Sequence, residues 1–117
     1  MKTPGNTVAF FRRADGTLTG YRAQGHTGYA EAGSDIVCAA VSALTQSTLN
    51  GLRSVLKAPV VFDIDDQSAT LEAYLAPEAS EEQVRQAQLL LRTLLEGLQA
   101  VQRSYPRNVR IVYEERR

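Results

Sequence analysis

Cysteine and histidine are scarce in this sequence, with one of each among 117 residues. A single cysteine excludes an internal disulfide, which fits a reducing compartment such as the cytoplasm. One cysteine and one histidine also fall two ligands short of a structural zinc site, and Glu31 and Asp35 are weak candidates to complete it. The sequence therefore predicts no disulfide framework, no metal site and no other cofactor.

An excess of charge of one sign is also missing, because 13 basic side chains balance 13 acidic ones. Proteins that mainly grip a phosphate backbone carry a basic surplus, so direct nucleic-acid binding is not expected. No apolar run reaches membrane-spanning length, and the N-terminal segment lacks the apolar core of a signal peptide. We expect one cytoplasmic domain over residues 1–117 that does not contact a membrane.

Two segments of β-prone, alternating sequence predict hairpins. The first covers residues 7–24 and turns at Asp15-Gly16, a dipeptide that tolerates the positive φ of a two-residue turn. The second pairs residues 60–64 with residues 69–75 across the polar turn 65–68. Residues 109–113 alternate in the same way and predict a closing strand.

A first helix follows the first hairpin. Its three-to-four-residue apolar spacing begins at Ile36, and Ser34 or Asp35 is the expected N-cap. Gly51 is expected to bend or loosen this helix, which ends at Pro59 at the latest.

A second, longer helix is predicted from Glu81 to Ser104. Ser80 and Gln83 form a capping box at its start, and a broad leucine-rich face runs along it. The order of elements is therefore ββαββαβ. Hairpins with interposed helices favour an α+β layered domain over a doubly wound parallel sheet.

The segment from Gly25 to Ser42 holds both His26 and Cys38. With Ser34 as the N-cap, Cys38 is the fourth residue of the helix, where the amide dipoles favour an anion. A thiol at such a place, close to a cation, has a lowered pKa and becomes a nucleophile. His26 would be that cation, acting first as base and later as acid. The alternatives are a cysteine that only packs and an ordinary loop histidine.

Several neighbours are candidates for supporting roles. Asp35 either stabilises the helix start or orients His26, and Ser42 is a weaker catalytic candidate one turn after the cysteine. Backbone amides at the helix start are the expected oxyanion donors. Gly28 and Gly33 either let the intervening loop close over an extended peptide or serve as turn glycines.

The same segment resembles the signature of a known family. Gly25-His26, followed by GSDIVCAAVS over residues 33–42, is similar to the motif of the ribosomal-processing cysteine proteases, the Prp family. The resemblance extends over nearly the whole chain, including a closing NVRIVYEE strand. Thr27 stands where an alanine is expected.

The resemblance implies a function and assigns roles to residues. It implies a cytoplasmic bacterial endopeptidase that removes an N-terminal extension from the twenty-seventh protein of the large ribosomal subunit, cutting after a phenylalanine. Cys38 would be the nucleophile and His26 the base and acid. Residues 27–33 would form the family's loop over the substrate. Its substrate-loop residues would be Gly25, Thr27, Gly28 and Gly33. The family resemblance also implies a homodimer.

Two functions of other classes stay open from the residues alone. One is a non-catalytic ribosome- or RNA-associated module on the same α+β scaffold, for which salt-sensitive RNA binding would be evidence. The other is a structural dimerisation domain in which Cys38 only packs, for which slow alkylation at neutral pH would be evidence. We expect dimerisation through residues 81–104 or through the cysteine helix, because both are rich in apolar or small residues.

Overall fold

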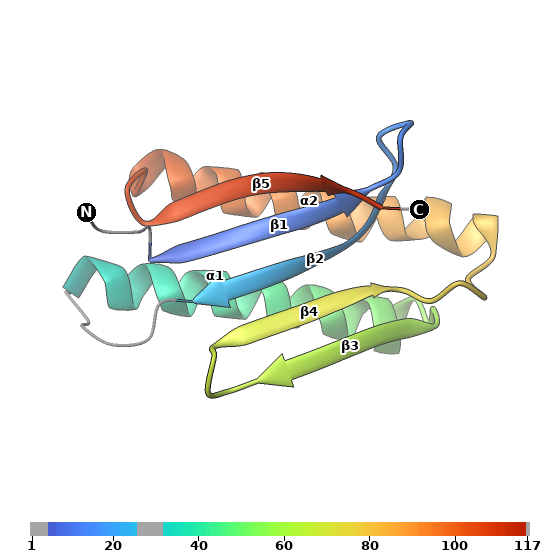
Figure 1. Cartoon of the computed structure of the whole chain (residues 1–117), viewed down its shortest axis with the longest axis horizontal. Coiled ribbons are helices and arrows are strands. Elements are labelled where there is room, and N and C mark those ends of the chain that lie inside the picture. The colour runs from blue at the N-terminus through green and yellow to red at the C-terminus, as the bar shows by residue number, and fades with distance from the viewer. Residues whose placement is uncertain (1–4, 26–31, 117) are drawn as a thin grey trace.

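The computed structural model describes residues 5–25 and 32–116, with residues 32–35 described by their backbone alone. Five strands form one sheet in the order β3-β4-β2-β1-β5, and both long helices lie on the same face of it (Figure 1). The predicted α+β order ββαββαβ is confirmed. The bounds are β1 Asn6–Arg12, β2 Leu18–Gly25, α1 Ala32–Asn50, β3 Val60–Asp65, β4 Thr70–Leu75, α2 Glu81–Ser104 and β5 Val109–Glu115.

Both predicted hairpins are present, and the sheet is mixed. β1 pairs antiparallel with β2 and parallel with β5, while β4 pairs antiparallel with β2 and β3. The first hairpin turns at Asp15-Gly16 as predicted, with Gly16 at φ 92° and the Asp15 carboxylate accepting from the Thr17 amide at 2.9 Å. The predicted two-residue turn is wrong, because the Arg13 amide donates to the Thr17 carbonyl at 2.8 Å across residues 14–16 and a bulge lies between Phe11 and Arg12. This pairing places Asn6 opposite Gly25, so the start of β1 and the end of β2 lie side by side.

The predicted start of α1 is wrong. The helix begins at Ala32, so Ser34 and Asp35 lie inside its first turn and do not precede it. Alanine is the best helix former and one glycine costs only about 1 kcal/mol, so the helix extends backward over Ala32 and Gly33. As a consequence, Cys38 is the seventh residue of the helix and lies in its second turn.

The other end of α1 confirms the role expected of Gly51. A π-helical turn, Gly51–Val55, follows the α-helix, and Lys57 closes it in the left-handed conformation at φ 58°. A π turn changes the phase of the helix. Val55, which α-helical spacing places on the apolar face, is therefore 80% exposed.

The α2 helix matches its prediction at both ends, and its capping box is formed by Ser80 and Gln83. Five of its apolar residues are buried against the sheet and α1: Val84, Ala87, Leu91, Leu94 and Leu98. Two glycines lie where the helices meet, and a Cβ would contact a leucine side chain at 3.3 Å in each case, Leu44 from Gly97 and Leu90 from Gly51. The leucine-rich face of α2 therefore packs against the sheet and α1 of the same chain.

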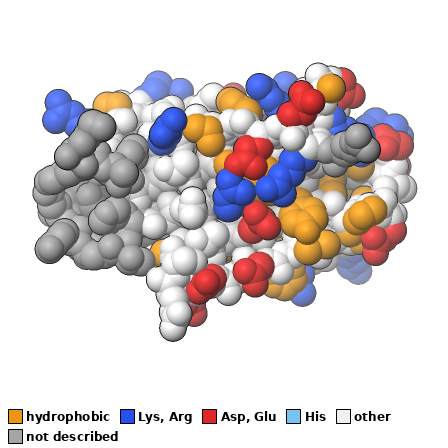
Figure 2. All heavy atoms as spheres, in the orientation of Figure 1, with side chains coloured by type: hydrophobic (Ala, Val, Ile, Leu, Met, Phe, Trp, Pro, Cys, Tyr) orange, Lys and Arg blue, Asp and Glu red, His pale blue; other side chains and the backbone are white. Residues whose placement is uncertain are grey.

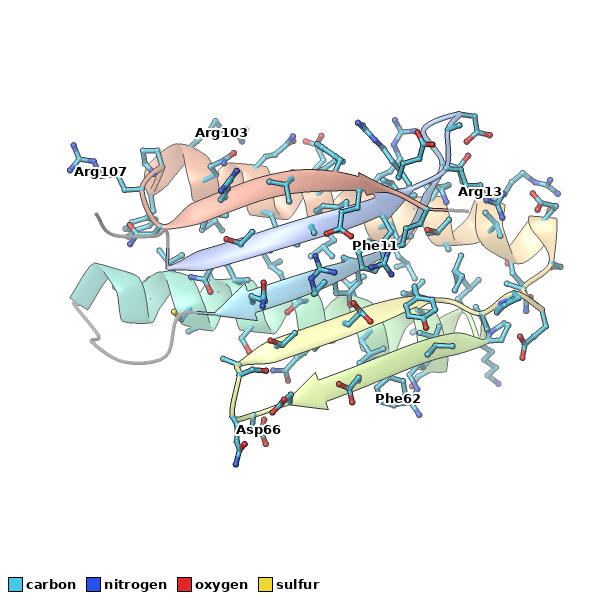
Figure 3. The ribbon with its side chains drawn as sticks, in the orientation of Figure 1. Phe11, Arg13, Phe62, Asp66, Arg103 and Arg107 are labelled. Carbon is cyan, nitrogen blue, oxygen red and sulfur yellow. The ribbon has the colours of Figure 1, made fainter. Side chains whose placement is uncertain are left out.

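The sheet face opposite the helices carries a cluster of ion pairs over its middle (Figure 2). Arg22 on β2 reaches Glu114 on β5 and Glu72 on β4. Phe11, labelled in Figure 3, is fully buried on this face, with the Arg116 guanidinium 3.7 Å from the ring centroid. Charged side chains therefore cover this aromatic residue in place of a third layer.

Candidate active site

A groove of about 290 Å³ lies at the end of the sheet where β1 begins and β2 ends. One wall is α1 and the other is the turn between β3 and β4, whose tip carries Asp66 (Figure 3). The α1 wall consists of Cys38, Val41, Ser42, Thr45 and Gln46. Asn6, Ala23 and Gly25 line it from β1 and β2. The groove is open to solvent, and the cysteine is in its lining.

Cys38 is half-buried, and its sulfur is in contact with a polar side chain. The Nδ2 of Asn6 donates a hydrogen bond to the Cys38 Sγ across 3.5 Å. Asn6 itself is 3% exposed, although it is a polar residue at the first position of a strand. A thiol in this position is reachable from the groove and has a hydrogen-bond donor beside it.

Backbone hydrogen bonds hold Asn6 and Gly25, which lie side by side in the groove lining. The Asn6 amide donates to the Asn108 carbonyl at 3.0 Å, and the Gly25 amide donates to the Ala69 carbonyl at 2.8 Å. Ala69 adopts the left-handed conformation, at φ 53°. These hydrogen bonds fix the position of Gly25, the last residue of β2, which directly precedes His26 in the sequence.

Ser42 lies one turn after Cys38 and is exposed in the groove lining. Its Oγ accepts a hydrogen bond from the Gln46 Nε2 at 2.7 Å. Thr45, on the same wall of the groove, donates from its Oγ1 to the Val41 carbonyl at 2.8 Å.

The acidic turn on the opposite wall is partly organised by its own backbone. The Asp65 carboxylate accepts from the amides of Gln67 at 3.0 Å and Ser68 at 3.4 Å. This arrangement keeps the turn compact and brings Ala69 to Gly25. Ile64 of β3 adds an exposed apolar side chain to the same wall.

Comparison with known proteins places the chain in a family. The family model described as cysteine protease Prp matches residues 7–110. The chain belongs to the cysteine protease Prp family. The predicted family resemblance and the predicted class of enzyme, a cysteine protease, are both confirmed.

Relatives in the Prp family cover most of the chain. The ribosomal processing cysteine protease Prp of Staphylococcus aureus is 29% identical over 108 residues, which is 92% of this chain and 98% of the relative. Prp of Bacillus subtilis is 29% identical over 101 residues, 86% of this chain and 89% of the relative.

Solved structures of S. aureus Prp have the same fold. Its complex with a substrate peptide matches with a TM-score of 0.80 at 28% identity, over 93% of this chain and 99% of that one. Its complex with a covalently linked product peptide matches with a TM-score of 0.74 at 27% identity and the same coverage.

The Prp fold brings together some of the predicted site residues. Cys38, Ser42 and Gly25 line one groove. The backbone of Gly33, Ser34 and Asp35 forms part of the first turn of α1. The remaining predicted site residues, His26, Thr27 and Gly28, lie outside the described residues.

Asn6 is a site residue that the sequence-based interpretation missed. The hairpin itself held the signal, because the pairing of β1 with β2, which includes a bulge between Phe11 and Arg12, places Asn6 opposite Gly25, directly before the histidine. What the hairpin does not reveal is that α1 packs so that Cys38 meets the same position.

The described residues hold no metal-binding cluster and no membrane-spanning helix. Among the side chains that the structure describes, no three His, Cys, Asp or Glu residues gather into a metal-binding cluster. Of the helices within residues 5–25 and 32–116, none combines the length and the hydrophobicity needed to cross a bilayer.

Proposed function

We propose that this Prp-family protease removes the N-terminal extension of the twenty-seventh protein of the large ribosomal subunit, cutting after a phenylalanine. In this proposal Cys38 is the nucleophile and His26 is the base and acid. The observation that carries the proposal is the position of Cys38, half-buried in the lining of an open groove with a hydrogen bond to its sulfur. A cysteine that served only as packing would not line a groove in this way.

The groove is suited to an extended peptide. It runs between α1 and the β3–β4 turn, with apolar lining from Val41, Leu71 and Ile64 and polar groups from Thr45 and Gln46. Apolar walls with a few polar groups are typical of ligand sites. The S. aureus relative, solved with a substrate peptide and with a covalently linked product peptide, supports a peptide as the ligand here.

The proposed reaction follows the chemistry of an activated thiol. The Cys38 thiolate attacks the scissile carbonyl carbon, and backbone amides at the start of α1 stabilise the oxyanion. The first N–H groups of a helix have no intrahelical partner, so they are free to donate there. The carbon–nitrogen bond then breaks as His26 gives its proton to the leaving amine. Water, deprotonated by His26, hydrolyses the thioester and restores the thiol.

Asp35 and the loop residues have secondary parts in this proposal. Asp35 is the candidate that orients His26, with Ser34 beside it at the helix start and Ser42 one turn beyond the nucleophile. The loop before α1 covers the bound peptide, with Gly28 as its conformational hinge. Gly33, which was expected to share that role, lies in the first turn of α1 instead. The whole activity is assigned to one domain over residues 1–117, acting in the cytoplasm.

We also propose that the protein is a homodimer. Most of the apolar surface of α2 is used inside the chain, but Leu89 on α2 and Ile36 on α1 remain 76% and 59% exposed. Sedimentation velocity at micromolar concentration is expected to give a dimer mass, and Leu89→Glu is expected to shift the protein toward the monomer. A monomer mass for the native protein would contradict this proposal.

The test of the proposed function uses a synthetic peptide that spans the ribosomal extension. Cys38→Ala and His26→Ala are each expected to abolish cleavage, measured by mass spectrometry of the products. The control is Ser47→Ala, which makes a similar small truncation at an exposed position of α1 and is expected to keep full activity. A fully active Cys38→Ala protein would end the proposal.

A further inference from the structure

The observed start of α1 changes how the Cys38 thiolate must be stabilised. The electrostatic effect of a helix N-terminus falls off within the first turn. Cys38 lies in the second turn, because the helix begins at Ala32. The helix start therefore supports a negative sulfur less than the sequence suggested, and another donor close to the sulfur gains importance.

The amide of Asn6 is such a donor, and its orientation is fixed. An asparagine NH₂ group has two hydrogens to donate. The Asn6 Nδ2 lies 3.5 Å from the Cys38 Sγ and 3.5 Å from the Asn108 carbonyl oxygen, so each hydrogen has an acceptor. Its Oδ1 lies on the side of Gly25, 3.5 Å from where a Cβ on that glycine would be.

The surroundings of Asn6 make this contact effective. Its side chain is 3% exposed, so water competes little for the donor. A hydrogen bond to a charged acceptor is stronger than one to a neutral acceptor, by roughly tenfold in an equilibrium. A donor aimed at the sulfur therefore favours the thiolate over the thiol.

We propose that Asn6 is a further catalytic residue, whose side-chain amide stabilises the Cys38 thiolate before it attacks the substrate. This inference rests on the proposed function, because it assumes that Cys38 is the nucleophile. It assigns to β1 a direct part in the reaction, in addition to the parts proposed for the end of β2 and for α1.

The experiment compares Asn6→Leu, which keeps the size and removes the donor, with a control, Thr19→Val. Thr19 is a buried strand residue whose hydroxyl donates to the Phe11 carbonyl at 3.4 Å, so its replacement removes a comparable buried hydrogen bond away from the sulfur. The rate of Cys38 alkylation by iodoacetamide is measured against pH, alongside peptide cleavage and thermal unfolding.

For Asn6→Leu we expect the rate of alkylation at pH 7 to fall by up to about tenfold, because the sulfur loses its hydrogen-bond donor. The kcat/KM for the peptide should fall by a similar factor, mainly through kcat. Thr19→Val should lose thermal stability and keep the native alkylation profile. Asn6→Asp retains the shape but presents a carboxylate, so it should alkylate more slowly still at pH 7.

Alkylation by iodoacetamide forms no oxyanion. Its rate therefore depends on the reactivity of the Cys38 sulfur and not on oxyanion stabilisation. Native alkylation rates in Asn6→Leu would overturn the inference even if peptide cleavage fell. If Asn6→Leu does not fold, Asn6→Asp decides the question in the same way, with native-like alkylation again overturning the inference. Failure of the proposed function would be seen in a different measurement, because the Cys38→Ala protein would then still cleave the peptide.

Discussion

The carbonyl of Ala69 accepts a hydrogen bond from the amide of Gly25 at 2.8 Å, and it does so from a left-handed backbone conformation at φ 53°. This conformation is unfavourable for any residue with a Cβ. The turn between β3 and β4 thus carries local strain where it supports the last residue of β2. On the opposite side the same residue, Gly25, pairs with Asn6.

This relationship predicts that Ala69 is sensitive to a branched side chain. Ala69→Val is expected to lower the free energy of unfolding by about 1 kcal/mol, because β-branching worsens the left-handed conformation. Peptide cleavage should fall as well, because Gly25 is displaced. Ala69→Gly is the matched control and should be close to neutral, since relief of strain offsets the greater freedom of the unfolded chain. Urea denaturation and kinetics check both, and equal stability of the Val and Gly variants would contradict the prediction.

Two glycines predict opposite responses to the same substitution. A Cβ at Gly20 would lie 2.4 Å from the Ala73 carbonyl oxygen and 2.4 Å from the Tyr74 Cβ, so Gly20→Ala forces β2 and β4 apart. We expect a loss of about 3 kcal/mol or more in urea denaturation. A Cβ at Gly97 would meet only the Leu44 side-chain end at 3.3 Å, and alanine is the better helix former. Gly97→Ala should therefore be neutral or stabilising, and equal losses in the two variants would contradict this reading.

A buried tyrosine ties β2 to α1. The Tyr21 hydroxyl donates to the Thr45 carbonyl at 2.6 Å, and its side chain is fully buried. Tyr21→Phe is expected to lower the free energy of unfolding by about 1 kcal/mol at pH 7, because it removes this hydrogen bond.

The same residue predicts a dependence on alkaline pH. Burial raises the pKa of Tyr21 above its ordinary value of 10.0, so the folded state retains a proton that the unfolded state releases. Its contribution to stability is therefore complete below pH 10 and is lost as pH rises above that value. The stability difference between native protein and Tyr21→Phe should shrink above pH 10 in chemical denaturation. A difference that stayed constant up to pH 11 would contradict the prediction.

Local signals in the sequence predicted the elements well, because each depends on neighbouring residues. The turn at Asp15-Gly16 and the capping box at Ser80 and Gln83 are both present. The phase of α1 beyond Gly51 was missed, since a π turn depends on how the helix packs. The parallel pairing of β5 with β1 was also beyond reach, because no local pattern encodes strand order.

In the candidate site, too, the local sequence predicted some features and missed those that depend on tertiary packing. The motif from Gly25 to Ser42 identified Cys38 by chemistry, and the structure places it in a groove. The N-cap at Ser34 was wrong because helix propensity does not fix where the first turn begins. The contact between Asn6 and Cys38 joins residues 32 positions apart, and only tertiary packing creates it.

Glu114 provides a test of the ion pairs on the open face of the sheet. Its carboxylate bonds to Arg22 and lies 3.3 Å from the Arg116 guanidinium, and the hydrogen bond from Arg22 is the main reason that its pKa is lowered. A lowered pKa in the folded state contributes stability above the ordinary value of 4.5, and that contribution is lost as pH falls. The side chain is 36% exposed, so solvent screening keeps the contribution below about 1 kcal/mol.

Glu114→Gln is therefore expected to cost a few tenths of a kcal/mol to about 1 kcal/mol at pH 7 and low salt. The cost should diminish as pH falls below 4.5, because the carboxylate of the unfolded state takes up its proton first and the native carboxylate, whose pKa is lower, follows. It should also diminish in 1 M NaCl. Glu115→Gln makes the same change of charge at the exposed neighbouring position and should have a smaller effect. Urea denaturation of the three proteins at pH 7 and pH 3 measures this. A cost for Glu114→Gln that persisted unchanged at pH 3 would show that packing over Phe11, and not the ion pair, is what the carboxylate supports.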